Sequence, residues 1–403
     1  MIVKSLFNTI RPAVGLVIVL AFCGMASARD DGRDDGGSIF RDDNPDQQCT
    51  CTLTPPVIPG VTAPSSPTPG INYCSYSAPF PNVSTQMLET YLPRRVANAR
   101  IVYDPTTDTS FGELRLPPGN PPPGGWPVVV YIHLGAWSVD YTLDEPAPFL
   151  EKLTNVAGVA TWSLEWRRIG SVHGGGSLAG DAPSGGWPNS FLDVGKGTDY
   201  VRTLAATYPL NLNRVIVMGH SSGGHLAAWV AGRHNLPTTA DLYVANPLPL
   251  VGLVVQEGKV DLETSLLVSG RTDVYTLLGT VVYAPDGTLA YSGDSALLAQ
   301  RLAEASPINL LPFGMPERLI VGALEPQPGL QDEQINFVQR ARAGGDDAQV
   351  VLEMERVGAS DDLVPDATGW PTEIGAVLSV LKPDTKLTGC AGASWPKHHH
   401  DDH

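Results

Sequence analysis

The stretch VIVMGHSSGGHLAAW, residues 215–229, joins a run of buried-strand residues to a glycine-rich corner and an apolar helical pattern. Its centre, Gly219-His220-Ser221-Ser222-Gly223, has the G-x-S-x-G spacing of a nucleophile elbow, in which a serine stands on a sharp turn between a strand and a helix. Side chains at the two glycines would collide across that turn. The stretch therefore predicts a nucleophile at Ser221, with the backbone N–H of Ser222 directed at a developing oxyanion.

Short β-branched runs alternate with helical patterns on both sides of this corner. Such alternation predicts an α/β fold, in which helices cover both faces of a mostly parallel sheet. The expected strands cover residues 99–104, 112–117, 127–134, 159–166, 214–221, 252–258, 318–324 and 349–355. The expected helices cover residues 145–157, 190–208, 222–234, 332–345 and 371–382.

The two ends of the chain differ from this pattern. Residues 1–28 have a basic start, an apolar run and the small residues Ala26-Ser27-Ala28, which predict a cleaved secretory signal peptide. We expect an acidic and Pro/Ser-rich leader over residues 29–88, one α/β domain over 89–383, and a His/Asp-rich tail over 384–403. The protein is then secreted or periplasmic.

The chain is acidic, with a net charge of -16. Cleavage after Ala28 would remove Lys4 and Arg11 and no acidic residue, so the mature charge would be about -18. Such a charge disfavours nucleic acid and anionic membrane surfaces. No later segment has about 18 uninterrupted apolar residues, so we expect no membrane partner.

Four cysteines follow the signal sequence: Cys49, Cys51, Cys74 and Cys390. An even number in an oxidising compartment favours disulfides, and four cysteines allow three pairings. Zinc binding is the weaker alternative, because the chain has no C-x-x-C pair. The pairing itself stays open.

Several further motifs stand in a fixed order: VVVYIHLGAW, EWRRIG, GGWPNSFLDV, GHSSGGHLAAW, ASPINLLP and RLIVGALE. Over about residues 96–381 the chain resembles secreted esterases of the α/β-hydrolase superfamily, related to acetyl and feruloyl esterases and to kynurenine formamidase-like enzymes. The resemblance implies a single domain, acyl transfer to water and a small-molecule ester or acylated substrate. It implies neither a cofactor nor a metal ion, and no feature of the sequence predicts an oligomeric state.

The oxyanion loop departs from the pattern of these esterases. Their H-G-G-x-W appears here as residues 133–137, HLGAW, so that Leu134 replaces the first glycine. The resemblance makes the Leu134 and Gly135 segment the second source of oxyanion donors. A side chain at Leu134 is expected where the backbone approaches a ligand, which would narrow the site.

The acid and the base of the expected catalytic triad also depart from the pattern. The acid after the seventh strand of these folds is usually Asp, and here Glu325 takes that place, with Asp261 as an alternative. The triad histidine follows the eighth strand, where this chain has Ser360. A serine hydroxyl cannot accept a proton near neutral pH.

Other bases are conceivable from the sequence. His220 is the second elbow residue and is expected to point away from Ser221. Asp361 and Asp362 follow Ser360, and the tail contains His398, His399, His400 and His403. The sequence therefore predicts a serine carboxylic ester hydrolase with weak or lost activity. The alternative is a catalytically silent hydrolase scaffold that binds a ligand or a protein.

Overall fold

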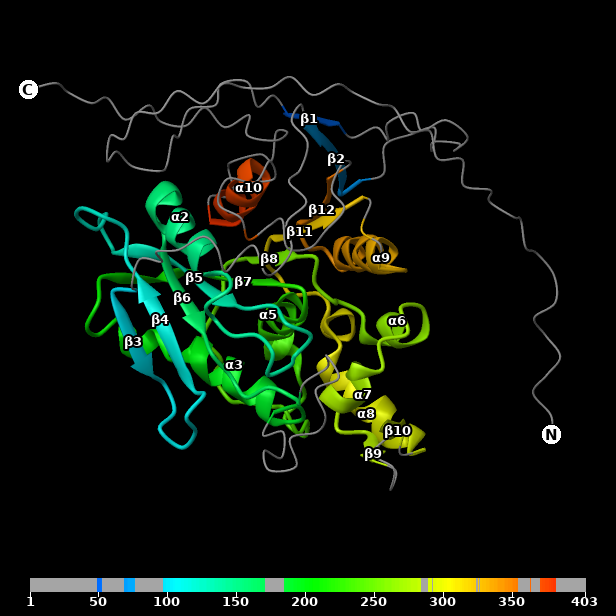
Figure 1. Ribbon diagram of the computed structural model, residues 1–403. Helices are drawn as coiled ribbons and strands as arrows, with labels where there is room; N and C mark the ends of the chain where they lie inside the picture. The colour runs from blue at the N-terminus through cyan, green and yellow to red at the C-terminus, as the bar shows by residue number, and fades with distance from the viewer. Residues whose placement is uncertain are drawn as a thin grey trace, which may run out of the picture. The chain divides into compact units, whose positions relative to one another are not determined.

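The computed structural model contains a ten-stranded sheet with the strand order β1-β2-β12-β11-β8-β7-β5-β6-β4-β3 (Figure 1). The structure describes residues 49–52, 69–76, 97–170, 185–283, 289–291, 293–323, 325, 327–353, 363 and 370–381. All of them lie in one compact unit, Pro45–His403. The predicted signal peptide and C-terminal tail lie outside the described residues.

The sheet is mostly parallel, which confirms the predicted fold class. Every pairing from β2 across to β6 is parallel, whereas β1 with β2, β4 with β6 and β3 with β4 are antiparallel. The strands of this sheet are β1 (Cys49–Thr52), β2 (Ile71–Tyr76), β3 (Ala99–Val102), β4 (Phe111–Arg115), β5 (Trp126–Ile132), β6 (Ala160–Leu164), β7 (Leu210–His220), β8 (Leu253–Gln256), β11 (Glu317–Gly322) and β12 (Ala348–Glu353).

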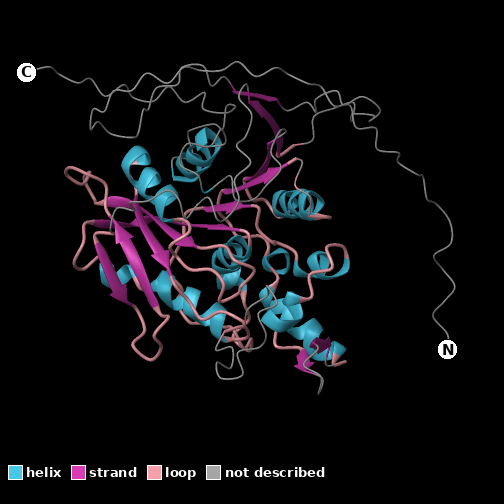
Figure 2. Cartoon of the chain, in the orientation of Figure 1, coloured by secondary structure: helices cyan, strands magenta, loops and turns pink. Residues whose placement is uncertain are grey.

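Helices cover both faces of the sheet (Figures 1 and 2). One face carries α2 (Ala147–Ala157) and α10 (Trp370–Leu381), which contact each other. The other carries α3 (Asn189–Asp199), α5 (Ser222–Gly232) and α9 (Leu330–Ala343). The remaining described elements are α4 (Val201–Leu204), α6 (Leu262–Leu267), α7 (Asp273–Leu277), α8 (Ser295–Ala305), the 3-10 turns η1 (Arg233–Asn235) and η2 (Pro307–Leu310), and the ribbon β9 (Val281–Tyr283) with β10 (Leu289–Tyr291).

The central strands read as continuous apolar runs because both of their faces are buried. In β5, Val128 and Val130 belong to the core beneath α3, α5 and α9, whereas Val129 and Tyr131 belong to the core beneath α2 and α10. All four are fully buried. This two-sided burial fixes the register of the strand, so the carboxyl ends of β5, β7 and β8 meet at one edge of the sheet.

The structure adds elements that the sequence patterns did not predict. β2 lies within residues 29–88, the segment expected as a leader, and it pairs in parallel with β12 through Val350 and Ile71. Three short helices, α6 to α8, fill the connection between β8 and β11. None of the helices in the described ranges is long and apolar enough to cross a membrane.

Candidate active site

Ser221 occupies the corner between β7 and α5, at the carboxyl edge of the sheet. Its backbone angles are φ 53° and ψ -117°, a conformation that non-glycine residues adopt only under strain. Its N–H donates a 2.8 Å hydrogen bond to the carbonyl oxygen of Gln256 at the end of β8. The residue is only half-buried, so the corner holds a partly accessible hydroxyl at the start of a helix.

Two glycines make this corner possible. A Cβ added to Gly219 would lie 2.3 Å from the carbonyl oxygen of Gly223, inside the turn. A Cβ added to Gly223 would lie 2.1 Å from the carbonyl oxygen of Ile132 and 2.3 Å from that of His133. No side chain fits at either distance, so the first turn of α5 lies directly against the end of β5.

The loop after β5, residues 133–137, therefore runs beside Ser221. Its last three residues all have positive φ: 127° at Gly135, 52° at Ala136 and 58° at Trp137. Two strained non-glycine residues in succession are typical of a functional loop. The Leu134 side chain, which we expected to narrow the site, is 7% exposed and packs into the core beneath α2 and α10.

The loop is fastened to α5 by Trp137 and His225. The indole Nε1–H of Trp137 donates a 3.1 Å hydrogen bond to Nδ1 of His225, and the two rings meet edge to face. The Nε2–H of His225 then donates to the carbonyl oxygen of Ala305 at 3.0 Å. Burial lowers the pKa of His225 to about 4, so the ring is neutral and both of its nitrogens are engaged.

His133 is fixed in a similar way. Its Nδ1–H donates to the carbonyl oxygen of Leu134 at 2.7 Å, and its Nε2 lies 3.3 Å from Oε1 of Glu165. Glu165 also binds Arg168, with an Nη2 to Oε1 distance of 3.2 Å. Burial opposes ionisation of Glu165, but His133 and Arg168 hold its pKa below the ordinary value. This buried cluster supports the oxyanion loop from below.

The predicted bases, together with His234 and Ser360, are distributed as follows. His220 is the last residue of β7 and is fully buried. His234 is exposed beyond the far end of α5, where its Nδ1 contacts the carbonyl oxygen of Ala231 at 2.9 Å. Ser360, Asp361, Asp362, His398, His399, His400 and His403 lie outside the described residues.

The two predicted acids have different surroundings. Asp261 is the N-cap of α6: its Oδ1 accepts from the N–H groups of Glu263 and Thr264, and its Oδ2 accepts from the Thr264 hydroxyl. That carboxylate is occupied by its own helix. Glu325 follows β11, is half-buried, and accepts a 3.1 Å hydrogen bond from the N–H of Gln327. Among the described residues, the Glu325 carboxylate thus accepts fewer hydrogen bonds than that of Asp261.

Sequence reasoning missed Lys259, which follows β8 by three positions. Its side chain is almost fully buried at 2% exposure, and among the described residues its Nζ has no hydrogen-bond partner. Burial lowers its pKa to about 8, with Arg271 adding to the effect and Glu333, Glu325 and Glu257 opposing it. No motif marks a lone lysine, so only its burial in the fold reveals it.

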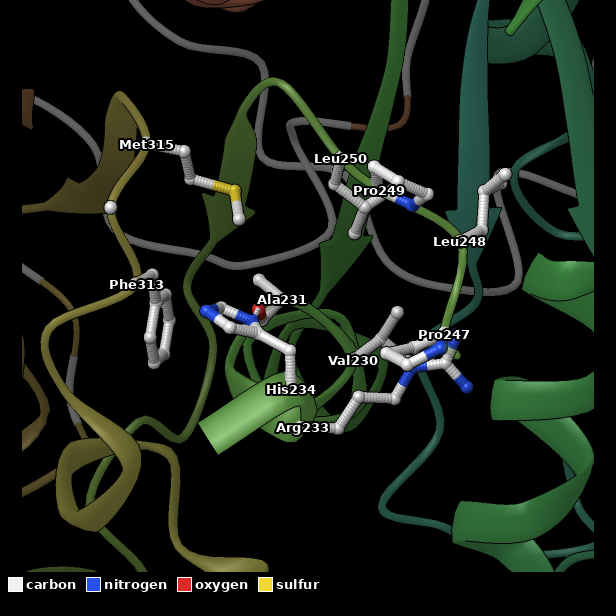
Figure 3. A pocket seen from close by; sticks show the side chains of 11 residues that line it. Val230, Ala231, Arg233, His234, Pro247, Leu248, Pro249, Leu250, Phe313 and Met315 are labelled. Atoms are coloured by element: carbon white, nitrogen blue, oxygen red, sulfur yellow. Dashed lines mark hydrogen bonds between the residues drawn. The ribbon is translucent and has the colours of Figure 1, made fainter. Parts of the chain in front are cut away.

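A cavity of about 270 Å³ lies elsewhere (Figure 3). Val230, Ala231 and His234, at and just beyond the end of α5, face Phe313 and Met315 across it. Val230, the lining residue of α5 nearest to Ser221 in the chain, follows it by nine positions, which is about 13.5 Å along the helix at 1.5 Å per residue. The cavity is therefore distinct from the serine corner.

Within the described ranges, no group of three His, Cys, Asp or Glu side chains is arranged to hold a metal ion. The site built from the described residues thus consists of a strained serine, a glycine-walled corner and an adjoining loop with positive φ angles. These parts suit attack by a hydroxyl on an acyl group.

Part of the chain matches a known protein family. The family described as BD-FAE matches residues 114–262, which run from β4 to the start of α6 and include the whole serine corner. No curated protein sequence matches the chain.

Solved esterase structures share the fold. The hyperthermophilic esterase from the archaeon Pyrobaculum calidifontis is 17% identical over 75% of this chain and 88% of its own, with a TM-score of 0.54. A truncated carbohydrate esterase from gut microbiota is 18% identical over 72% and 98%, also at 0.54. Esterase LipW from Mycobacterium marinum is 17% identical over 74% and 84%, at 0.50.

The doubly covered parallel sheet, the strand–serine–helix corner and these likenesses define the fold class of the protein, which is the α/β-hydrolase fold. The segment of the chain that matches BD-FAE, residues 114–262, contains the serine corner.

Proposed function

We propose that the protein is an exported carboxylic ester hydrolase that acts on small-molecule esters. Ser221 is the nucleophile, the N–H groups of Ser222 and of the Leu134–Gly135 segment stabilise the oxyanion, and Glu325 is the acid. The observation that carries the proposal is the strained φ of 53° at Ser221, at the exact start of α5. The first N–H groups of a helix have no intrahelical partner and favour negative charge.

The chemistry follows from this placement. Ser221 Oγ attacks the ester carbonyl carbon, and the charge that develops on the carbonyl oxygen meets the N-terminal N–H groups of α5. In other serine hydrolases, loss of one such donor costs roughly 10²–10³ in kcat. The alcohol then leaves and water releases the acyl group. Because a triad histidine is absent from position 360, we expect turnover below that of a complete triad.

Covalent labelling with a fluorophosphonate probe and hydrolysis of p-nitrophenyl acetate test the proposal together. The wild type should be labelled at Ser221 and should hydrolyse the ester, and Ser221→Ala should abolish both. Ser295→Ala is the matched control, because Ser295 is exposed at the start of α8. Hydrolysis that survives Ser221→Ala would refute the assignment of the nucleophile.

A silent binding scaffold is the second candidate. It is favoured by the engagement of both ring nitrogens in His133 and in His225, and by the serine at position 360. In that case the wild type would neither be labelled nor hydrolyse the ester, while keeping a cooperative unfolding transition.

Export is part of the proposal because Ala26-Ser27-Ala28 follows an apolar run. The intact mass of the secreted protein should correspond to a chain that begins at Arg29. A mass that includes residues 1–28 would contradict cleavage at this site.

A further inference from the structure

The serine corner needs a group that accepts a proton, and histidine does not supply it in the expected way. No histidine occurs between positions 236 and 397 of the sequence. His133 and His225 flank the corner, but the ring nitrogens of each are engaged with the neighbours described above. Any base that serves Ser221 therefore has to be another kind of side chain or a histidine from outside the expected position.

Lys259 lies on the segment that adjoins this corner. Ser221 N–H donates to the carbonyl oxygen of Gln256, and a Cβ added to Gly224 would lie 2.7 Å from the Cα of Gly258. The chain after β8 thus runs against the first turn of α5. Lys259 follows at the next Cα, about 3.8 Å further on.

The neighbours of Lys259 also adjoin the site. Glu325 is the proposed acid, and its negative charge raises the pKa of Lys259. The positive charge of Arg271 lowers that pKa. The Arg271 guanidinium lies 5.9 Å from the centre of the Trp137 ring, in the proposed oxyanion loop. Lys259 therefore interacts electrostatically with the proposed acid and with Arg271, which itself lies beside Trp137.

The ordinary interpretation is that Lys259 is the counter-ion of a buried carboxylate. Glu333 on α9 does exert the largest charge effect on Lys259, but the two side chains form no direct ion pair. Glu333 on α9 accepts from the Asp261 N–H at 2.7 Å and from the Ser265 hydroxyl at 3.0 Å. Glu257 accepts from the Gly322 N–H at 2.9 Å. Within the described residues, no carboxylate lies within 4.0 Å of the Lys259 ammonium, as an ion pair requires.

A buried ammonium without such a partner is costly, and a lysine in this situation lowers the cost by giving up its proton. We infer that Lys259 is the base that accepts the proton of the Ser221 hydroxyl, a role that rests on the proposed function. The site is then a serine–lysine pair, with Glu325 stabilising the ammonium that forms.

The proton balance closes over both half-reactions. The neutral amine takes the Ser221 proton as Oγ bonds to the carbonyl carbon, and the carbonyl π pair moves to oxygen. The ammonium returns that proton to the alcohol oxygen as its bond to carbon breaks, which leaves acyl-Ser221. Water then adds by the same transfer, and the proton passes to Ser221 Oγ as the carboxylic acid leaves.

The lowered pKa of Lys259, about 8, agrees with this role because the amine is partly neutral in mildly alkaline solution. The charged groups that act on it are Glu333 from α9, Glu325 from the loop after β11, Glu257 beside it in the chain, and Arg271 between α6 and α7. The kcat/KM of the wild type should therefore rise with pH through an apparent pKa near 8. If the base were a histidine instead, kcat/KM would rise with pH through an apparent pKa near the ordinary histidine pKa of about 6.5.

Two substitutions separate a base from a structural cation. Lys259→Met removes the amine, whereas Lys259→Arg keeps a positive charge that cannot be given up. Both should lower kcat for p-nitrophenyl acetate and the rate of fluorophosphonate labelling by 10²–10⁴, the usual contribution of a general base. Lys152→Met on α2, on the opposite face of the sheet, should keep the wild-type rate.

Chemical rescue by an added amine distinguishes a base from a structural cation, because free amine in solution cannot replace a structural side chain. Ethylamine added to Lys259→Ala should restore part of the labelling, in proportion to the concentration of neutral amine. Labelling of Ser221 in Lys259→Met within threefold of wild type would overturn the inference and leave the proposed function standing. So would a wild-type pH profile with its limb near 6.5, which requires no variant to fold. If Ser221 is neither labelled nor required, the proposed function fails and this inference fails with it.

Discussion

The Trp137 indole donates a 3.1 Å hydrogen bond to Nδ1 of His225, and this contact fastens the oxyanion loop to the helix that begins beside Ser221. Both side chains are fully buried, and neither is part of the G-x-S-x-G motif. The loop and Ser221 thus share one support. The position of the proposed oxyanion donors relative to Ser221 depends on a neutral imidazole in the core.

That dependence predicts a loss of stability in acid. The folded pKa of His225, about 4, is below its ordinary value of 6.5, so its contribution is complete above pH 6.5 and is lost as the pH falls towards 4. The loss can reach about 3 kcal/mol. Urea unfolding should give a lower free energy of unfolding at pH 5 than at pH 7.5 in the wild type. The difference between the two pH values should be smaller in His225→Phe. His234→Gln, at the exposed end of α5, should keep the wild-type difference.

Gly223→Ala should disrupt the site. A methyl group at this position would lie 2.1 Å from the Ile132 carbonyl oxygen, so α5 and the end of β5 would have to separate. We expect fluorophosphonate labelling to fall at least tenfold and Tm to fall by several degrees. Gly170→Ala is the matched control, since an added Cβ there meets nothing within 4 Å. Equal behaviour of the two variants would contradict the packing described for the corner.

Glu317→Gln should stabilise the protein in alkaline solution. Glu317 is fully buried at the start of β11, and burial together with the nearby charge of Asp346 raises its pKa to about 9. Its folded pKa is above the ordinary value of 4.5, so its contribution is complete below pH 4.5 and is lost as the pH rises towards 9. Thermal unfolding at pH 8 should show a higher Tm for the variant, and the difference should shrink at pH 4.5.

Glu263→Gln provides the comparison for that measurement, because Glu263 is exposed in the first turn of α6. Its Tm should stay close to wild type at both pH values. A Glu317→Gln protein that is less stable at pH 8 would mean that the ionised carboxylate is compensated in the fold.

The β1–β2 register selects one of the three cysteine pairings. Cys51 and Cys74 stand directly opposite each other on antiparallel strands. Opposed residues in such a pair have Cα atoms roughly 4.5–5.5 Å apart, a separation that a disulfide spans. We predict a Cys51–Cys74 bond, which leaves Cys49 and Cys390 as the remaining pair.

Peptide mapping of the unreduced secreted protein by mass spectrometry checks this pairing. Cys51→Ser should lower stability by about 3 kcal/mol if the closed loop acts on the unfolded chain alone. A linked Cys49–Cys51 or Cys49–Cys74 peptide would exclude the predicted bond.

The central sheet was predictable from the sequence because its strands are apolar on both faces. The runs at 127–134 and 214–221, for example, correspond to β5 and β7, each bounded by glycine or polar residues. The corner at Ser221 was also predictable from the sequence, because only glycine fits at positions 219 and 223. Both features depend on residues that are close together in the sequence, so short sequence patterns were enough to predict them.

Features that depend on distant partners were not predictable. INYCSY in β2 has a weak strand pattern and becomes a strand by pairing with β12. The Leu134 side chain was expected to narrow the site, but it packs into the core beneath α2 and α10. Lys259 belongs to no motif, and its burial is evident only in the folded chain.

The pairing of β2 with β12 has a consequence for the order of folding. The Asn72 amide donates to Oε1 of Gln349, a residue 277 positions later in the chain. Contacts of this kind raise the contact order and delay folding, because a long loop must close before they form. During synthesis β2 emerges early, but its neighbour β12 is the last of the described strands to be made. The sheet can therefore be completed only after Glu353 has been synthesised, and a chain cut down to residues 89–383 would carry the backbone edge of β12 uncovered, ready to pair with another molecule.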